Sequence, residues 1–258
     1  MNTKNPTNSS TPRLITIAVS HYCEKARWAL DWLKIPYVEE NHAPPFNRFH
    51  TRLHGGTTVP LLVTEGGNFV DSTDILHYLD SISPQSHRLY PINPLQRQEV
   101  DKLEDLFDRQ LGVSTRCWVY FYVLDRPKLV QNVWCMGVPK LEQVGCAIAF
   151  PLLRNMVRKA FNSTSEGAAR SLSKIKEIFA KVEKRLEGQK YLVGDSFTAA
   201  DLTFAALSAP VIRPAEHPIM SSEFRGLPEE MLNVIQELRS TPAGKYALHL
   251  YREMRETR

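Results

Sequence analysis

The chain has 258 residues, of which 43% are hydrophobic and 23% are charged, so its composition is that of an ordinary soluble globular protein. A chain of this length can bury enough surface to form a core without disulfides or a structural metal. The net charge of +4 is spread along the chain without long runs of one sign, which argues against a dedicated nucleic-acid binder.

The cysteines and the apolar stretches bear on where the protein works. The four cysteines form no C-x-x-C pair and no zinc-spaced array with histidine, so we expect free thiols, a reducing compartment and a cytoplasmic location. The most apolar stretch, residues 144–153, is too short to cross a bilayer, and we expect no integral membrane segment. Residues 1–12 are rich in Asn, Thr, Ser and Pro and predict a flexible tail.

Residues 13–82 have the pattern of a small α/β domain. β-branched runs predict strands, apolar residues at helical spacing predict helices, and Pro36 ends the first helix. The expected order is a strand over 14–19, a helix over 26–33, a strand over 37–40, two strands over 60–64 and 68–70 around a hairpin turn, and a helix over 72–81. This order predicts a βαβ opening followed by a hairpin.

Beyond this region only helical patterns follow. Residues 83–94 are rich in Pro, Ser and Asn and predict a linker, and residues 95–258 predict an all-α domain. Residues 95–124 fit one long helix, and the last two helices begin near Pro228 and Pro242. The sequence therefore predicts an α/β domain at 13–82 and a larger helical domain after it.

The first candidate for chemistry is the sequence Ser20-His21-Tyr22-Cys23, where the first strand meets the first helix. The positive end of a helix favours an anion there, and a hydroxyl at Ser20 could donate a hydrogen bond to a thiolate. An ordinary N-cap role for Ser20 is the alternative.

Two further signals lie later in the α/β region. In Thr58-Val59-Pro60, a cis peptide bond before Pro60 would turn the backbone groups of Val59 toward an extended peptide, although most X-Pro bonds are trans. Asp71 and Ser72 open a helix, where they either cap it or hold the carboxylate and ammonium ends of an amino acid.

Two other patterns are assigned structural roles. Thr198 and Asp201 have capping-box spacing and predict the start of a helix that enters the core. His50 and His54 have the i, i+4 spacing of a helical metal chelate, but no third ligand lies near them in the sequence, so an exposed helix face is favoured and no metal is expected.

Together these signals resemble the cytosolic glutathione transferase family, of the serine type with a Ser-x-x-Cys motif. The resemblance implies a thioredoxin-like domain with a mixed four-stranded sheet, followed by the helical domain. It also implies that Thr58, Val59 and a cis Pro60 contact glutathione as co-substrate, and that Asp71 and Ser72 hold its γ-glutamyl end. Ser20 resembles the catalytic hydroxyl.

The sequence departs from the family pattern at two places. Tyr22 stands where many relatives have proline, and its hydroxyl is a second candidate donor to the thiol. Cys23 resembles the inward position of C-x-x-C relatives, where a packed small side chain is favoured over a redox thiol. The segment at 125–165 is longer than usual in the family, and we expect it to line or cover the substrate site.

The resulting expectation is a glutathione transferase of the detoxification kind, in which the activated thiol attacks a small, apolar electrophile. The resemblance implies a homodimer. Two alternatives remain at this point: a non-catalytic ligand carrier or scaffold with the same fold, and a glutathione-dependent thiol transferase or reductase that uses Cys23.

Overall fold

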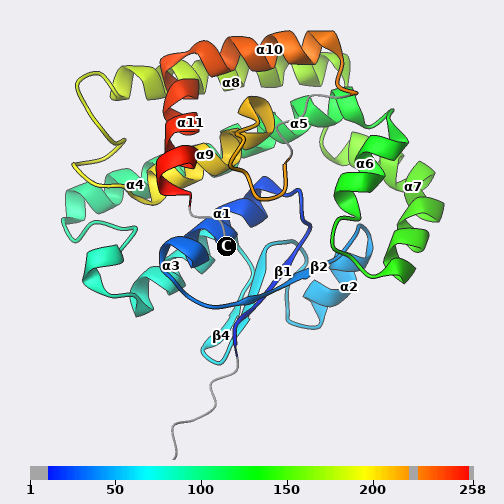
Figure 1. Ribbon diagram of the computed structural model, residues 1–258, viewed down its shortest axis with the longest axis horizontal. Helices are drawn as coiled ribbons and strands as arrows, with labels where there is room; N and C mark the ends of the chain where they lie inside the picture. Colours follow the sequence, from blue (N-terminus) through cyan, green and yellow to red (C-terminus); the bar gives the residue numbers. More distant parts are fainter. Residues whose placement is uncertain (1–10, 221–225, 256–258) are drawn as a thin grey trace, which may run out of the picture.

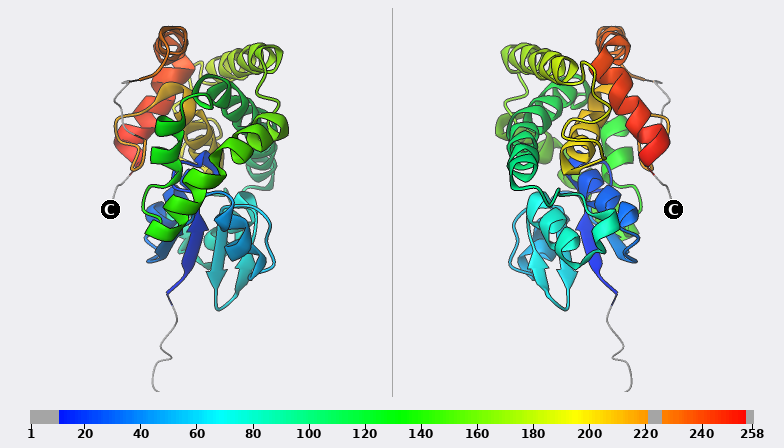
Figure 2. Two further views of the ribbon diagram at one scale, coloured as in Figure 1. Left: turned by 90° about the vertical axis from the view of Figure 1, so that its right-hand side faces the viewer. Right: turned by 90° about the vertical axis from the view of Figure 1, so that its left-hand side faces the viewer.

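The computed structural model describes residues 11–220 and 226–255, apart from the side chain of Ser86. The tail expected at 1–12 lies almost entirely outside these ranges. The described chain forms a sheet-containing half and a helical half stacked against each other (Figures 1 and 2).

The sheet has four strands in the order β2-β1-β3-β4. Its strands are β1 (Arg13–Thr16), β2 (Val38–Asn41), β3 (Leu61–Thr64) and β4 (Gly67–Phe69). β1 pairs parallel with β2, and the pairs β1-β3 and β3-β4 are antiparallel, because a helix connects the first two strands and a tight turn the last two. Gly67 takes up a φ of 132° at that turn, which a side chain would disfavour.

Three helices complete this half: α1 (His21–Trp32), α2 (Phe46–Arg52) and α3 (Ser72–Ile82). α1 and α3 pack together, and the inner strand residues Leu14 and Leu62 are fully buried with the α1 residue Trp28. The expected mixed four-stranded sheet with helices is confirmed.

The second half is entirely helical within the described residues. After a short 3-10 turn at Gln85–His87 its helices are α4 (Pro94–Leu106), α5 (Gly112–Val123), α6 (Pro127–Trp134), α7 (Lys140–Ala160), α8 (Ser165–Arg185), α9 (Ala199–Ile212), α10 (Glu229–Ser240) and α11 (Pro242–Met254). α11 begins with Pro242 at its first turn, as the sequence predicts, and Pro228 lies one residue before α10 as its N-cap.

The long helix expected at 95–124 is interrupted. Residues Phe107–Leu111 form a π-turn between α4 and α5, and the backbone stays in the right-handed helical region on both sides of it. A π-turn adds one residue to a helical turn and so changes which side chains face a neighbour, and such turns are frequent at functional sites. Asp108, within this π-turn, contacts Tyr22 and Lys25 of α1.

α9 is the central helix of the molecule. Every residue from Ala199 to Ile212 is buried, and α9 packs against α1, α4, α5, α10 and α11. The predicted capping box is present at its start. The Thr198 side chain accepts a hydrogen bond from the Asp201 backbone N–H, and the Asp201 carboxylate accepts one from the Thr198 backbone N–H. Asp201 also accepts hydrogen bonds from the Leu192 amide at 2.8 Å and the Tyr246 hydroxyl at 2.6 Å. The buried carboxylate therefore joins three segments of the helical half.

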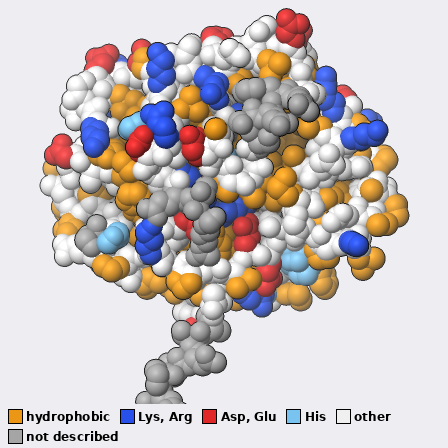
Figure 3. Space-filling view, viewed as in Figure 1, with side chains coloured by type: hydrophobic (Ala, Val, Ile, Leu, Met, Phe, Trp, Pro, Cys, Tyr) orange, Lys and Arg blue, Asp and Glu red, His pale blue; other side chains and the backbone are white. Residues whose placement is uncertain are grey.

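α7 has an unusual surface. Five large apolar side chains are exposed along it, at Leu141, Val144, Ile148, Leu152 and Met156. In Figure 3 hydrophobic side chains are visible at the right-hand edge of the molecule, where Figure 1 shows α7. None of the helices in the described ranges is both long enough and apolar enough to span a membrane.

Candidate functional site

A cavity of about 730 Å³ lies between the sheet half and the helices α4 and α5. Six of the eight residues that the sequence singles out as candidates for glutathione binding or catalysis line it, namely Tyr22, Thr58, Val59, Pro60, Asp71 and Ser72. Its other described lining residues are Val70, Thr73, Asp74, His77, Asp101, Glu104, Asp105, Asp108, Arg109, Val113 and Arg116. Residues from both halves therefore form one concave surface.

The loop before β3 forms one wall of the cavity. The peptide bond between Val59 and Pro60 is cis, as the resemblance implies, and Pro60 is buried while Thr58 is exposed. Among the described residues no hydrogen-bond partner of the Val59 backbone is found. Its N–H and C=O groups are free to pair with an extended ligand.

The N-terminus of α3 forms the neighbouring wall. Asp71 is the N-cap, and one of its carboxylate oxygens accepts a hydrogen bond from the Thr73 amide at 2.8 Å. Ser72 is the first helical residue and is 3% exposed. A helix start of this kind favours a ligand carboxylate, and the second oxygen of Asp71 can accept from an ammonium group.

Ser20 is the N-cap of α1, and its side-chain oxygen accepts a hydrogen bond from the Cys23 amide at 3.4 Å. Its side chain is half-buried, and neither it nor Cys23 is among the described side chains that line the cavity. The capping role uses only a lone pair of the oxygen, so the hydroxyl proton can still be donated to an anion.

Tyr22 lines the cavity, but its hydroxyl is engaged. It donates a hydrogen bond to the Asp108 carbonyl at 2.6 Å, and burial raises its pKa to about 12. A hydroxyl whose proton is held by a carbonyl, and which gives up that proton only at high pH, is a weak candidate for stabilising a thiolate.

Cys23 is completely buried, and burial raises the pKa of its thiol to about 11. A thiol reacts as its thiolate, which is scarce at neutral pH when the pKa is this high. The geometry agrees with the packed role that the sequence favours for Cys23.

The wall formed by α3, α4 and the π-turn is strongly acidic. The cavity has six carboxylate side chains, at Asp71, Asp74, Asp101, Glu104, Asp105 and Asp108, against three positive groups: the guanidinium groups of Arg109 and Arg116 and the Lys25 ammonium beneath the wall. This excess of negative charge suits a ligand that presents an ammonium group to α4.

A buried ion-pair network lies beneath this wall. The Lys25 ammonium, on α1, lies 2.7 Å from a carboxylate oxygen of both Glu104 and Asp108. Burial alone would lower the pKa of Lys25, but the two carboxylates outweigh it and the pKa is raised. The Thr73 hydroxyl lies 3.1 Å from Glu104 and 2.9 Å from Asp108, and the Tyr90 hydroxyl donates to Glu104 at 2.7 Å.

Sequence reasoning missed this network. Lys25 follows the helical pattern of α1 as an ordinary charged residue, and no local signal distinguishes it from a solvent-exposed lysine. Only the packing of α1 against α4 shows that its partners lie about 80 residues away. Residues 125–165, which were expected to line or cover the substrate site, contribute no described residue to the cavity.

The first turn of α1 is held to the helical half through backbone oxygens. Besides the bond from Tyr22, His21 is hydrogen-bonded through its Nε2 to the Gly112 carbonyl at 3.0 Å. A Cβ atom at Gly112 would lie 2.5 Å from the Tyr22 hydroxyl oxygen, so any larger residue here would displace the Tyr22 ring from its present position.

The histidine pair is not arranged as the sequence suggests. α2 ends at Arg52, so His54 lies outside the helix, 3.1 Å from the Arg13 guanidinium. His50 instead stacks on His42, with ring centroids 3.5 Å apart. The two histidines therefore do not share the exposed helix face that the sequence predicts, because His54 lies beyond the end of α2.

Comparison with known proteins agrees with this architecture. The sequence model of the glutathione S-transferase N-terminal domain matches residues 14–87, and that of the C-terminal domain matches residues 143–221, together more than half of the chain.

Solved structures share the fold at low sequence identity. The β-etherase LigF from Sphingobium sp. strain SYK-6 is 20% identical, with a TM-score of 0.60 over 93% of this chain and 99% of that one. A theta class glutathione S-transferase from Xanthomonas axonopodis pv. citri with glutathione bound is 19% identical, with a TM-score of 0.57 over 96% and 98%. A glutathione S-transferase from Methylobacillus flagellatus with glutathione bound is 18% identical, with a TM-score of 0.54 over 92% and 98%. The chain belongs to the glutathione S-transferase family.

Proposed function

We propose that the protein is a glutathione transferase that binds glutathione in the 730 Å³ cavity and activates its thiol for attack on an electrophile. The observation that carries this proposal is the convergence of Val59, Asp71 and Ser72 on one cavity that α1 borders through Tyr22. These residues are far apart in the sequence and offer complementary groups for the two ends of one short peptide.

In this arrangement the cysteinyl part of glutathione pairs with the free backbone groups of Val59 as an added strand. Its γ-glutamyl carboxylate lies at the N-terminus of α3 beside Ser72, and its ammonium group faces Asp71 and the acidic wall of α4. The excess of carboxylates in the cavity supports this orientation because it favours the ammonium end.

The role of Ser20 follows from its place at the start of α1. Its hydroxyl donates to the glutathione thiolate, and the positive end of the helix adds to that stabilisation. Thiolate formation and proximity to a bound electrophile together supply the rate. The engaged hydroxyl of Tyr22 and the buried thiol of Cys23 support Ser20 over both alternatives.

The substrate class is less constrained than the thiol chemistry. One structural relative is named a β-etherase and another a theta class transferase, and both names fit a thiolate that attacks an electrophilic centre. We propose a small apolar electrophile held against the helical half. We also propose the domain division at 13–82 and 95–258, a homodimer and a cytoplasmic location, on the family resemblance.

The experiment measures the pKa of the glutathione thiol on the protein, from the ultraviolet absorbance of the thiolate as the pH is varied. A hydrogen bond to a charged group contributes about 1.5–3 kcal/mol, so Ser20→Ala should raise the pKa of the bound thiol by about 1–2. Calorimetric affinity for S-methyl glutathione, which has no thiol proton, should stay the same.

Tyr22→Phe is the matched control, since it also removes one hydroxyl near the same helix turn. It should leave the pKa of the bound thiol unchanged. A raised pKa with Tyr22→Phe and not with Ser20→Ala would transfer the role to Tyr22. Absence of glutathione binding at millimolar concentration would favour the non-catalytic scaffold.

A further inference from the structure

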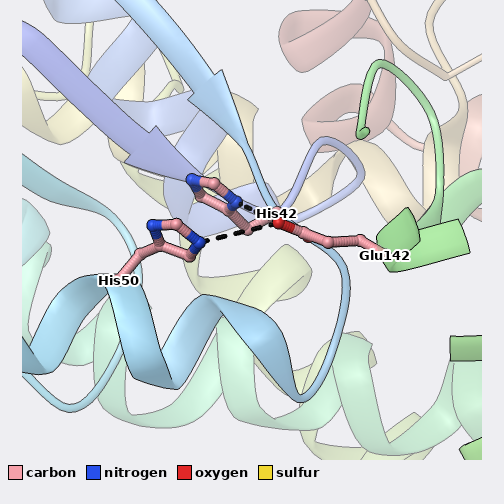
Figure 4. A group of neighbouring side chains, drawn as sticks. All are labelled: His42, His50 and Glu142. Atoms are coloured by element: carbon pink, nitrogen blue, oxygen red, sulfur yellow. Dashed lines mark hydrogen bonds and ion pairs between the residues drawn. The ribbon is translucent and has the colours of Figure 1, made fainter. Parts of the chain in front are cut away.

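Two histidines and one glutamate from separate segments meet beside α2 (Figure 4). His42 follows β2, His50 is on α2, and Glu142 is in the first turn of α7. One Glu142 oxygen lies 2.8 Å from Nδ1 of His42 and 3.6 Å from Nε2 of His50. The three ligand atoms all lie within 4.8 Å of one another.

The spacing fits a tetrahedral metal site. With Zn–N and Zn–O bonds of about 2.0–2.2 Å, two ligand atoms at a tetrahedral angle are about 3.3 Å apart. The two distances to Glu142 lie on either side of this value. Imidazole and carboxylate are also ligand types that zinc takes in proteins.

The surroundings hold the ligands in place. The second oxygen of Glu142 accepts a hydrogen bond from the Ala43 amide at 2.9 Å, and the backbone N–H of His42 donates to the Thr16 carbonyl at 2.9 Å. The bond from the Ala43 amide orients the Glu142 carboxylate as outer hydrogen bonds orient carboxylate ligands in known metal sites. The loop that carries His42 is therefore fixed to both β1 and α7.

The charge balance points to a cation. The side chains of Glu142 and His42 are only 10% and 9% exposed, and in the described ranges Glu142 has no lysine or arginine partner. A buried carboxylate is costly without a positive partner. The contact to the carboxylate, which can only accept, places the ring proton of His42 on Nδ1, and the other ring nitrogen is buried without a hydrogen-bond partner. A cation bound between Nδ1 and Glu142 would replace this proton, which the free nitrogen can take up.

One side chain must move for all three to bind the same ion. The two imidazole rings are stacked at 11°, and a metal ion lies in the plane of each imidazole that binds it. The side chain of His50 is 33% exposed, so it has room to turn its nitrogen toward the other two ligands. The same exposure leaves one coordination position open to water.

We propose that His42, His50 and Glu142 form a binding site for Zn²⁺, completed by a water molecule, that ties α7 to the sheet half. None of the three lines the cavity assigned to glutathione, so the site is separate from the thiol chemistry. α7 also exposes five large apolar side chains, and a metal tie at its first turn would fix the position of that surface.

The test is calorimetric titration of Zn²⁺ into the full chain, after removal of any affinity tag and of bound metal with a chelator. One equivalent should bind. Glu142→Gln and His50→Gln should each weaken binding by at least about tenfold, and both should keep the circular dichroism spectrum of the parent. His54→Gln is the matched control, since it removes a histidine four residues along the chain, and it should bind Zn²⁺ like the parent.

A second measurement follows thermal unfolding. Zn²⁺ at about a hundred times its dissociation constant should raise the midpoint of the parent by about 5–10 °C. The rise should be lost in Glu142→Gln and His50→Gln and kept in His54→Gln.

Three results would overturn the proposal. The first is no stoichiometric Zn²⁺ binding to the parent chain. The second is binding that survives in both Glu142→Gln and His50→Gln. The third concerns Cys135, whose thiol lies near Glu142 and Cys146. Binding that Cys135→Ser abolishes, with a thiolate charge-transfer band when Co²⁺ replaces Zn²⁺, would mean that the ion is bound by cysteine.

Discussion

Lys25 provides the sharpest test of how the two halves are joined. Its side chain is fully buried, and its ammonium lies 2.7 Å from the carboxylates of Glu104 and Asp108. The Lys25→Met variant keeps most of the side-chain volume and removes the positive charge. Glu104, which is 1% exposed, and the mostly buried Asp108 then lose their cationic partner.

Breaking a buried ion pair from one side costs about 3–5 kcal/mol, because an uncompensated charge stays in the interior. In a chain of this size such a loss lowers the thermal midpoint by about 6–20 °C. Urea unfolding followed by circular dichroism measures the free energy directly. Lys174→Met is the matched control, since Lys174 pairs with Glu177 on the surface of α8, where ion pairs contribute little.

The pH dependence of the free energy of unfolding separates the effect of the lost charge in Lys25→Met from the effect of altered packing. Burial already raises the pKa of Asp108, and loss of Lys25 removes the group that opposes this rise. The folded variant then binds a proton at a pH at which the unfolded chain does not, so its stability deficit should shrink as the pH falls from about 8 to about 5. A deficit under about 1 kcal/mol at neutral pH, or one that is equal at both pH values, would refute the reasoning.

Three further outcomes are expected. Asp201→Ala leaves the buried donors of Leu192, Thr198 and Tyr246 without their acceptor, and urea unfolding should show a loss of about 3 kcal/mol or more. Burial lowers the pKa of His21 to about 3, below its unfolded value of 6.5, so the unfolded chain binds the extra proton and His21 alone should lower the stability by about 2 kcal/mol between about pH 7 and pH 5. Buried His217, whose pKa is lowered to about 4, adds to this fall, so His21→Gln should reduce the loss by about 2 kcal/mol, and an unchanged slope would contradict the assignment. Iodoacetamide at neutral pH should label half-buried Cys135 well before Cys23, as read by mass spectrometry, and faster labelling of Cys23 would reopen the redox role.

Much of the fold could be predicted because its signals are local. The β-branched run before Ser20 predicts β1, Gly66 and Gly67 predict the hairpin, and Thr198 with Asp201 predicts the start of α9. The cis bond before Pro60 came from family resemblance, since most X-Pro bonds are trans.

What could not be predicted depends on long-range packing. The π-turn at Phe107–Leu111 arises inside a pattern that reads as one helix, and Lys25 looks like a surface residue until its partners on α4 are known. The prediction that His50 and His54 share an exposed helix face is wrong because the sequence shows their spacing but not that α2 ends at Arg52. Its neighbours His42 and Glu142 are 100 residues apart, beyond the reach of any spacing rule.

The anchoring of α1 on backbone oxygens has a consequence for how this interface changes in evolution. A carbonyl is supplied by every amino acid, so substitutions at position 108 keep the acceptor for Tyr22, and substitutions at 21 or 22 need no compensating side chain there. We therefore expect little pairwise covariation between the first turn of α1 and the π-turn among relatives that share the contact. In an alignment of these relatives, the contact should instead be marked by a glycine at position 112 wherever a bulky residue occupies position 22.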